Sequence, residues 1–305
     1  MDTVGTRSPE ADFEEHRPLL LGLAYRLLGS MWDAEDAVQE AYLRWTRANR
    51  DEVREPRAYL VTVVSRLAID QLRSARATRE AYVGPWLPEP VETAAVGPLD
   101  TAELRDTLSY ATLHLMEQLT PPERAVFVLR EAFELPYDAI ADILGVPAAT
   151  CRQLRHRAAE RLGDARGDRG GDAGGDRGAG RFQPSGEEHA RLLARLIDAA
   201  QGGDLAALTE LFSQDVVAWT DGGGKTRAAL RPVTGRDRVV AFALGLLDRY
   251  RVEDISVIEA NGQPALRMTM NGHQQITLLD VRDGLIHGLY GVLNPDKLTH
   301  LGWED

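Results

Sequence analysis

Residues 120–162 read TPPERAVFVLREAFELPYDAIADILGVPAATCRQLRHRAAERL and decide the fold of the middle of the chain. The run from Thr120 to Glu123 is a capping box with proline at the first helical position, so a helix should begin there. A short helix over 137–144 should end at Gly145, which can adopt the left-handed conformation of a helix terminus. Pro147 then opens a third helix, which runs to Leu162.

The third helix of this stretch has one apolar and one basic face. Four residues recur at helical spacing and should face inward: Cys151, Leu154, Ala158 and Leu162. The exposed face is polar: Arg152, Gln153, His156 and Arg157. A helix, a glycine turn and a basic helix predict a helix-turn-helix, whose second helix enters the major groove of DNA. A solvated helix hairpin within a bundle would give the same pattern, so that alternative stays open.

Length and composition narrow the class of protein. The chain of 305 residues is long enough for two or three domains. It has no run of about 18 apolar residues and no signal peptide, which predicts a soluble, cytoplasmic protein without a membrane partner. Cys151 is the only cysteine, which excludes an internal disulfide and fits a small core residue. The histidines have no metal-binding spacing, so we expect neither a metal nor a cofactor.

The net charge of −12 is unusual for a protein that binds nucleic acid, but the basic residues are concentrated locally. Residues 54–79 hold six arginines against two acidic residues, and residues 147–162 hold four against one. Charges are screened beyond about 8 Å at physiological salt, so these segments can attract phosphates locally. The overall acidity predicts weak non-specific DNA binding by the free chain, which needs a partner or a conformational change to engage DNA.

Two connecting segments divide the chain into three modules. Residues 163–180, GDARGDRGGDAGGDRGAG, have no apolar side chain larger than alanine and should form a flexible tether. Four prolines around Trp86 and Leu87 indicate a stiffer linker. We therefore predict modules at 11–80, 100–162 and 184–300, joined by a linker over 81–99 and a tether over 163–183.

The first module is predicted to be all helix. Helices should run over 13–28, from a cap at Asp33, and from Pro56. The second helix should bury Ala34, Ala37, Val38, Ala41 and Trp45, and the third should bury Leu60, Val63, Val64, Leu67 and Leu72. The exposed face of the second helix is acidic, and that of the third is basic. Solvated faces explain most such stripes, but this separation of sign between neighbouring helices favours two binding surfaces.

The third module alternates helix with strand. Helices are expected over 189–200, 204–212 and 236–250, and strands over 216–220, 252–259, 265–270, 274–281 and 285–293. The pairs Asn261-Gly262, Asn271-Gly272 and Asp283-Gly284 are strong hairpin signals. Helices followed by an antiparallel meander predict an α+β domain. The chain is thus expected to be multidomain, with two all-α modules before an α+β domain.

Three segments resemble the extracytoplasmic-function (ECF) sigma factors, the minimal bacterial transcription initiation factors. They are DAEDAVQEAYLRW at 33–45, PRAYLVTVVSRLAIDQLR at 56–73, and LTPPERAVFVLR at 119–130 with the helix-turn-helix that follows. The third module resembles the cone-shaped SnoaL-like domains of the NTF2-like superfamily. WLPEP at 86–90, DGGGK at 221–225 and NPDKL at 294–298 are similar to signatures of the sigma subgroup with such a domain. The resemblance implies sigma region 2 in the first module and region 4 in the second.

The resemblance also implies core RNA polymerase and promoter DNA as partners, with polymerase contacts at its β′ clamp helices and β flap. The polymerase-binding residues would be Asp33, Asp36, Gln39, Glu40 and Leu43. The residues for the −10 element, where a base is flipped out, would be Arg57, Arg66, Asp70, Arg73 and Arg76. The residues for the −35 element would be Thr150, Arg152, Gln153, Arg155, His156 and Arg157.

Two positions depart from the family pattern. Leu154-Arg155 stands where recognition helices of the family often carry Arg-Leu, so the arginine that reaches the bases stays open. Ser65-Arg66 stands where an Arg-Asn pair is common, which leaves the −10 base preference open.

The role of the third module has three candidates. Catalysis needs a carboxylate or histidine as acid or base, together with a hydrogen-bond donor to an oxyanion. The available groups, Asp221, His273, His287 and Tyr290, are scattered in the sequence, so we expect no enzyme. A sensor would hold an unknown small molecule in an apolar pocket. We favour an intramolecular regulator, because a tethered domain has an effective concentration of about millimolar. Its contact residues would be Trp86, Leu87, Pro88, Glu89, Pro90, Asp221, Gly222, Gly223, Gly224, Lys225, Asn294, Pro295, Asp296, Lys297 and Leu298.

Lys225 and Lys297 are the only lysines of the chain. This rarity suggests a specific role for each, such as pairing with Glu89 or another carboxylate of the sigma modules. The sequence as a whole predicts an ECF-type sigma factor regulated in cis by its third module, with no dedicated anti-sigma factor evident. The alternative is a DNA-binding regulator without polymerase contact, whose third module senses a small molecule or acts as an enzyme.

Overall fold

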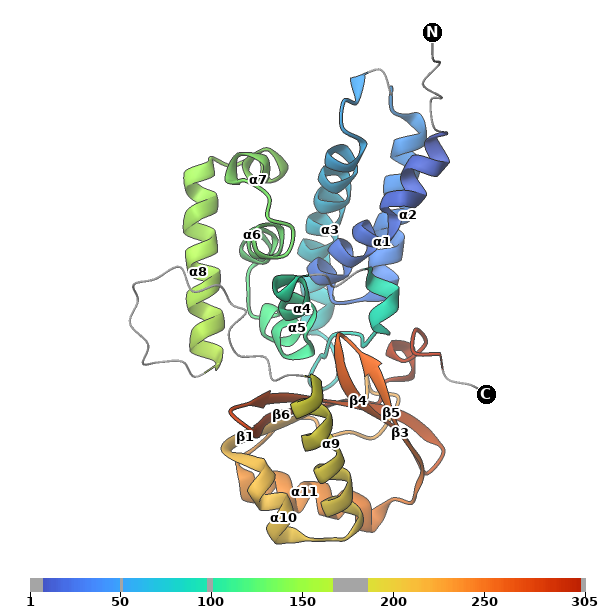
Figure 1. Cartoon of the computed structure of the whole chain (residues 1–305), viewed down its shortest axis with the longest axis vertical. Helices are drawn as coiled ribbons and strands as arrows, with labels where there is room; N and C mark the ends of the chain where they lie inside the picture. The colour runs from blue at the N-terminus through green and yellow to red at the C-terminus, as the bar shows by residue number, and fades with distance from the viewer. Residues whose placement is uncertain (1–7, 50–51, 98–100, 167–185, 303–305) are drawn as a thin grey trace. The chain divides into compact units, whose positions relative to one another are not determined.

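The computed structural model describes residues 8–49, 52–97, 101–166 and 186–302 (Figure 1). Backbone contacts divide these residues into two compact units. The helical unit contains the described residues up to 76, together with 94–97 and 115–166, and the sheet unit contains 77–93, 101–114 and 186–302. The linker and the start of the second module therefore group with the third module. No helix in the described ranges is both long and apolar enough to cross a membrane.

The helical unit begins with α1 (Pro9–Leu28), α2 (Met31–Arg47) and α3 (Pro56–Glu80). The cap predicted at Asp33 is wrong: Ser30 caps α2, and its hydroxyl accepts the backbone N–H of Asp33 at 3.2 Å. Asp33 lies in the first turn instead, where its charge suits the positive end of the helix. All the inward residues expected of α2 are buried. In α3, Val63 and Leu67 are only half-buried.

The predicted helix-turn-helix is confirmed by α6 (Pro121–Glu131), α7 (Tyr137–Leu144) and α8 (Ala148–Arg166). The Glu123 carboxylate accepts the Thr120 backbone N–H at 3.0 Å, as the capping box requires. Gly145 has a φ of 67°, and the four expected inward residues of α8 are buried. The helix α8 continues past Leu162 to Arg166. The rest of the predicted tether, 167–183, lies outside the described residues.

The sheet unit holds α4 (Ala102–Leu108), the first residues of α5 (Tyr110–Met116) and the elements of the third module. Its further helices are α9 (Gly186–Gln201), α10 (Leu205–Leu211) and α11 (Arg236–Arg249). Its strands are β1 (Phe212–Asp221), β2 (Val233–Thr234), β3 (Val252–Ala260), β4 (Gln263–Met270), β5 (His273–Arg282) and β6 (Leu285–Val292). The expected helices and strands are present, and the sequence pattern missed β2 and the short 3-10 helices η2 (Thr93–Val96) and η4 (Pro295–Lys297).

The strands form one sheet in the order β2-β1-β6-β5-β4-β3. Antiparallel hairpins join β3 to β6, and their turn residues Asn261, Asn271 and Asp283 have φ values of 53°, 49° and 50°. A left-handed glycine follows each of them, which confirms the hairpin predictions. The strand β1 pairs parallel with β6, so the sheet is not the purely antiparallel meander that was expected. A parallel pair needs a long crossover, which α11 and β3 to β5 provide.

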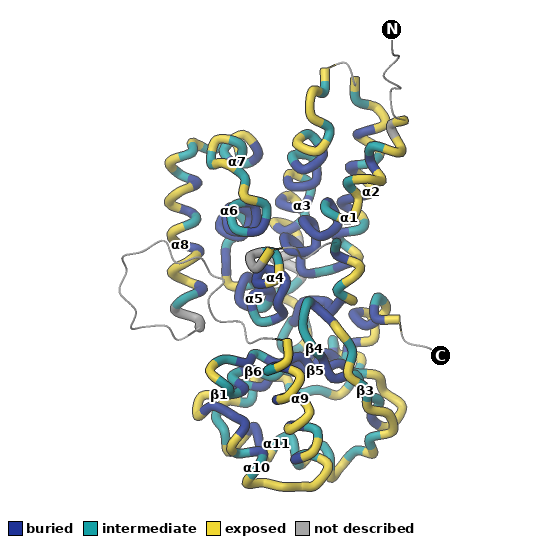
Figure 2. The backbone as a smooth tube through the Cα atoms, in the orientation of Figure 1, coloured by how far each residue is buried: buried dark blue, intermediate teal, exposed yellow. Residues whose placement is uncertain are grey.

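Successive strand residues point to opposite faces of a sheet, and both faces are buried here. On one face, aliphatic side chains of α9, α10 and α11 pack on strand residues such as Leu279. On the other face, Leu278 belongs to a cluster with Leu87 of the linker, Tyr110 of α5 and Leu298. Figure 2 shows the resulting buried backbone along β5 and β6. The linker is thus part of a core that the third module completes.

Candidate functional site

The WLPEP string of the linker lies in the second core of the sheet unit. Leu87 has no exposed surface, and residues 88–90 are also buried. The Pro88 carbonyl accepts the Tyr110 hydroxyl at 2.6 Å. Asn261 accepts the Val91 N–H on Oδ1 at 3.1 Å and donates its own N–H to the Val91 carbonyl at 3.0 Å. A proline-rich segment cannot satisfy its backbone groups in a helix, so the sheet unit supplies the partners.

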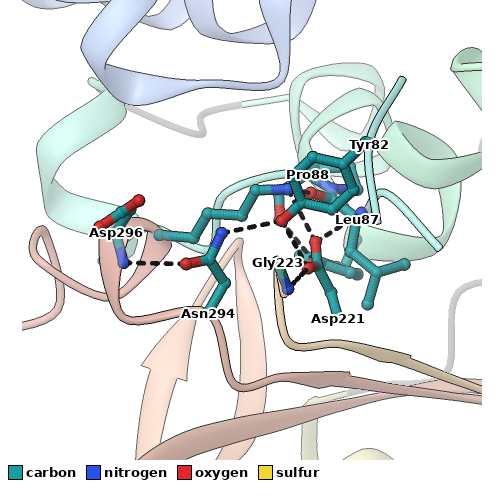
Figure 3. A network of polar contacts seen from close by, with 9 residues as sticks. Tyr82, Leu87, Pro88, Asp221, Gly223, Asn294 and Asp296 are labelled. Atoms are coloured by element: carbon teal, nitrogen blue, oxygen red, sulfur yellow. Dashed lines mark hydrogen bonds and ion pairs between the residues drawn. The ribbon is translucent and has the colours of Figure 1, made fainter. Parts of the chain in front are cut away.

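Asp221, the last residue of β1, is fully buried and is the centre of a polar network (Figure 3). Its carboxylate accepts from the Tyr82 hydroxyl at 2.6 Å, the Lys297 ammonium at 2.7 Å, the Leu87 N–H at 2.9 Å and the Gly223 N–H at 3.0 Å. A buried carboxylate is tolerated when it is paired and hydrogen-bonded. Asp221 therefore binds the linker to the third module through one charged group.

Lys297 supplies the positive charge of this network, and its side chain is 11% exposed. Its ammonium also donates to the Leu87 carbonyl at 2.5 Å. It lies 4.0 Å from the centroid of the Trp86 ring and 4.8 Å from that of Tyr82, as in a cation–π contact. Trp86 carries the Arg79 guanidinium as well, at 3.9 Å.

Both lysines pair with aspartates. Lys297 binds Asp221, and the Lys225 ammonium lies 2.6 Å from the Asp296 carboxylate. Both carboxylates lie within the signature strings of the third module itself. The Lys225–Asp296 pair is more than half exposed, in contrast to the buried Lys297–Asp221 pair.

The glycine loop after Asp221 is shaped for close approach. Gly223 has a φ of 59°, and a Cβ there would lie 2.3 Å from Nδ2 of Asn294. Asn294 donates from that nitrogen to the Tyr82 hydroxyl at 2.8 Å. Burial, together with the hydrogen bond to Asp221, raises the pKa of Tyr82 well above its ordinary value. The phenol is therefore held protonated, as a donor to Asp221.

Glu89 pairs with a residue that the sequence analysis missed. Its Oε1 lies 2.5 Å from Nδ1 of His300, which follows the NPDKL string. Tyr82 was also missed, and Asn261 was predicted only as a turn residue. Nothing in the sequence indicates which distant residue either of them meets.

The start of α5 is docked on the sheet through aromatic rings. The ring centroids of Tyr110 and Tyr290 are 5.3 Å apart, and those of His114 and Trp219 are 4.9 Å apart. Trp219 stacks on Tyr290 with a centroid distance of 5.0 Å and an interplanar angle of 12°. Aromatic pairs of this kind stabilise a fold by more than the burial of their apolar area alone would.

The groups weighed for catalysis do not converge. Asp221 and Tyr290 are buried beside the linker, whereas His273 is exposed at the start of β5. His287 is half-buried, and its Nδ1 lies 3.7 Å from the Asp215 carboxylate. The buried residues on the face of the sheet under α9, α10 and α11 are mostly aliphatic.

The acidic face expected on α2 is present in the helical unit. Asp36, Gln39 and Glu40 are exposed, Asp33 is half-buried, and Leu43 is 41% exposed. Glu40 pairs with Arg44 at 2.9 Å. Trp32, which the sequence analysis did not single out, is 54% exposed at the start of the helix.

The basic residues of α3 have different surroundings. Arg57 is exposed, and Arg73 pairs with Asp70 at 3.1 Å. Arg66 donates to the backbone carbonyls of Asp142 at 2.7 Å and Ile143 at 3.3 Å, near the end of α7. Its neighbour Ser65 is fully buried and so faces the core. The side chain of Arg76 lies outside the described part of the structure.

Most polar residues on the outer face of α8 are exposed to solvent. Arg152, Gln153, His156 and Arg157 are exposed, and Thr150 is half-buried. Arg155 donates from Nε to the Glu131 carboxylate of α6 at 2.9 Å. Arg155 therefore helps to join α6 to α8. Arg152 is exposed, and its guanidinium lies 5.2 Å from the centroid of the Tyr137 ring.

Comparison with known proteins agrees with this architecture. Family models for sigma-70 region 2, sigma-70 region 4 and the SnoaL-like domain match residues 13–78, 110–162 and 193–287. The ECF RNA polymerase sigma factor SigJ of Mycobacterium tuberculosis is 37% identical over 302 residues, which cover 95% of this chain and 93% of that protein. The probable sigma factor SigI of the same species is 33% identical over 300 residues, 96% of each chain.

A solved structure shares the fold as well. The crystal structure of M. tuberculosis SigJ superposes with a TM-score of 0.74 at 34% identity, over 95% of this chain and 98% of that one. The two sigma regions define the chain as a transcription initiation factor of the sigma-70 class. It belongs to the ECF RNA polymerase sigma factors and carries a C-terminal SnoaL-like domain. Sigma factors of this family are not enzymes; they act with core RNA polymerase on promoter DNA.

Proposed function

We propose that the SnoaL-like domain regulates sigma activity in cis by holding the linker and the start of α5 on its sheet. The observation that carries this proposal is the Asp221 site, where one buried carboxylate binds a side chain and a backbone N–H of the linker. The linker connects regions 2 and 4, so fixing it restricts the arrangements that the two regions can adopt. Because the domain is tethered, its effective concentration is about millimolar and even a weak contact is effective.

The polymerase and DNA contacts complete the proposal. The acidic face of α2, with Leu43 as its apolar contact, would bind the β′ clamp helices, and region 4 would bind the β flap, in the cytoplasm. Arg57 and Arg73 are the exposed candidates on α3 for the −10 element, with Asp70 beside Arg73. Arg66 must first leave the α7 carbonyls to reach DNA. On α8, the candidates for the −35 element are Arg152, Gln153, His156 and Arg157. The proposal needs no separate anti-sigma factor.

In vitro transcription with core RNA polymerase tests the regulatory role. The full chain is compared with Lys297→Met, which breaks the buried network, and with Lys225→Met, which removes a surface pair as a matched control. We expect promoter-specific transcript yield to change for Lys297→Met and to stay near wild type for Lys225→Met. A rise would make the domain a brake, and a fall would make it a required scaffold. Equal yields from all three forms, with equal core binding, would contradict regulation through this contact.

A small-molecule role has one supporting observation. A cavity of about 400 Å³ lies where Val83 and Gly84 of the linker meet residues 220–230, and it includes Lys225 and Arg227. An anionic ligand with an apolar part would suit this lining. A ligand there would modulate the linker contact.

A further inference from the structure

Regions 2 and 4 each bind the end of a helix of the other region through an arginine. Arg66 of α3 donates to the backbone carbonyls of Asp142 at 2.7 Å and Ile143 at 3.3 Å, in the last turn of α7. Arg124 of α6 donates from Nε to the Arg26 carbonyl at 3.1 Å, in the last turn of α1. The last four carbonyls of a helix lack partners within it and carry partial negative charge, so both guanidinium groups are bound at sites that favour a cation.

The two contacts differ in burial. Arg124 is 1% exposed, and its Nη1 also pairs with the Glu117 carboxylate. The helix α6 that carries Arg124 packs on α1. Arg66 and Asp142 are both exposed, so their contact can open without unfolding either helix. Arg124 therefore fixes α6 to α1, whereas the Arg66 contact can open and close.

The Arg66 contact lies at the end of α7 that leads into the turn. Gly145 turns the chain with a φ of 67°, and α8 begins at Ala148. In a helix-turn-helix, the first residues of the second helix face the base edges, and the first helix crosses the DNA backbone. Region 2 is therefore held beside the end of region 4 that must approach the −35 element.

This contact distinguishes Arg66 from another candidate arginine of α3. Arg73 lies seven residues further along the helix and pairs with Asp70, also of α3, at 3.1 Å. Arg66 was predicted to bind the −10 element, yet here its guanidinium binds region 4. The same donors cannot bind the α7 carbonyls and DNA at once, so this contact and a −10 contact of Arg66 exclude each other.

We propose that Arg66 is the latch of an autoinhibitory contact, which in the free chain holds region 2 beside the DNA-facing end of α8. Region 4 then binds the −35 element only when Arg66 leaves the α7 carbonyls. Both sides of the latch lie in the helical unit, so this inference is separate from regulation by the SnoaL-like domain. It rests only on the −35 contacts proposed for α8.

Binding of the full-length chain, without polymerase, to a −35 duplex tests the latch. The duplex is one that the holoenzyme selects from a randomised −35 library, and fluorescence anisotropy measures the affinity. Arg66→Met removes the donors and keeps an apolar stem. We expect it to raise the affinity about fivefold, as for the loss of one partly exposed hydrogen bond from a charged group. Loss of a positive charge ordinarily weakens DNA binding, so electrostatics alone predicts the opposite sign.

Arg73→Met is the matched control. It removes the same charge from α3, where the described partner of Arg73 is Asp70 of the same helix. Its affinity for the duplex should equal that of the wild type or lie slightly below it. Arg66→Lys keeps the charge but lacks the planar fork that reaches both carbonyls, so its affinity should lie between those of the wild type and Arg66→Met. An affinity that stays unchanged or falls in Arg66→Met would overturn the latch.

Spin labels report whether the two regions separate. Thr46 of α2 and Ala159 of α8 are exposed, and the native Cys151 is buried. Pulsed electron resonance of the full-length chain, labelled at Thr46→Cys and Ala159→Cys, gives the distribution of distances between the regions. We expect a longer and broader distribution in Arg66→Met than in Arg73→Met. Equal distributions in the two variants would contradict the latch.

Arg152→Ala in the Arg66→Met background separates the latch from the −35 contacts on which it rests. Loss of the gained affinity would support both the latch and the role of α8. If the gain persists and the labels still separate, the latch is supported but α8 is not the helix that reads the duplex. If the labels separate without a gain in affinity, the contact joins the regions but does not inhibit, and the proposal is wrong.

Discussion

The ammonium of Lys297 lies 2.7 Å from Oδ2 of Asp221, and the Asp221 side chain has no exposed surface. The two residues come from different signature strings, and both also bind Leu87 of the linker. Removing one partner of a buried pair leaves an uncompensated charge, which costs about 3–5 kcal/mol. An exposed pair contributes only about 0–1 kcal/mol.

This contrast predicts unequal effects of the two lysine substitutions. Lys297→Met should lower the stability of the sheet unit by about 3 kcal/mol, and Lys225→Met by less than about 1 kcal/mol. Both stability losses can be measured by urea titration, with amide hydrogen exchange in β1 and the linker as the readout. Asp221→Asn combined with Lys297→Met should recover part of the loss, because no buried charge remains. Similar losses for the two single variants would contradict the assigned burial.

The glycine loop offers a matched pair of substitutions. Gly223 and Gly224 both have positive φ, at 59° and 73°, but only Gly223 has close neighbours: a Cβ would meet Asn294 at 2.3 Å, against 3.5 Å to Val83 at Gly224. Gly224→Ala should cost about 1 kcal/mol of backbone strain. Gly223→Ala should cost more and release Tyr82. Thermal unfolding and the exchange rate of the Leu87 amide distinguish the two, and a larger effect at Gly224 would refute the packing argument.

Two arginines of α8 should behave differently. Arg152→Ala should lower stability by less than about 1 kcal/mol, through loss of an exposed contact with the Tyr137 ring. It should weaken binding of the holoenzyme to its preferred −35 duplex about tenfold, because a base contact contributes about 1–3 kcal/mol. Arg155→Ala should instead lower stability, by about 1 kcal/mol, through loss of the partly exposed Glu131 pair. Fluorescence anisotropy with duplexes selected from a randomised −35 library measures affinity. Selective loss of sequence preference in Arg155→Ala alone would reverse the assignment.

His189 gives the SnoaL-like domain an acid sensitivity. Burial lowers its pKa to about 4 from the ordinary 6.5. Below about pH 6.5 the unfolded chain takes up a proton on this histidine that the folded chain does not. The free energy of unfolding therefore decreases as the pH is lowered. The loss between pH 7 and 5 should be about 2 kcal/mol. His189→Leu should remove this dependence in urea titrations, and the exposed His273→Gln should not. An unchanged slope in His189→Leu would assign the sensitivity to other groups.

Local signals predicted most elements, and long-range pairing accounts for what was missed. The capping box at Thr120 and the turn at Asn261-Gly262 act within a few residues, so sequence alone determines them. The parallel pairing of β1 with β6 depends on residues some seventy positions apart, which no local pattern encodes. The signature strings were recognised as contact elements, but the partners of Lys297 and Glu89 depend on the folded sheet. The cap of α2 was misassigned to Asp33, although Ser30, three residues earlier, is also a favoured cap residue and forms the bond.

Leu87, Tyr110 and the sheet share one core, so a chain that lacks the sheet would lose part of the core around its linker. A gene truncated after α8 would not encode two liberated DNA-binding modules. It would encode modules whose linker and α5 have lost the apolar cover supplied by residues such as Leu278 and Leu298, and exposed apolar patches of this kind promote aggregation. The C-terminal domain is in this sense a covalently attached folding partner, and its loss by a nonsense mutation should appear first as insolubility, whatever its effect on transcription.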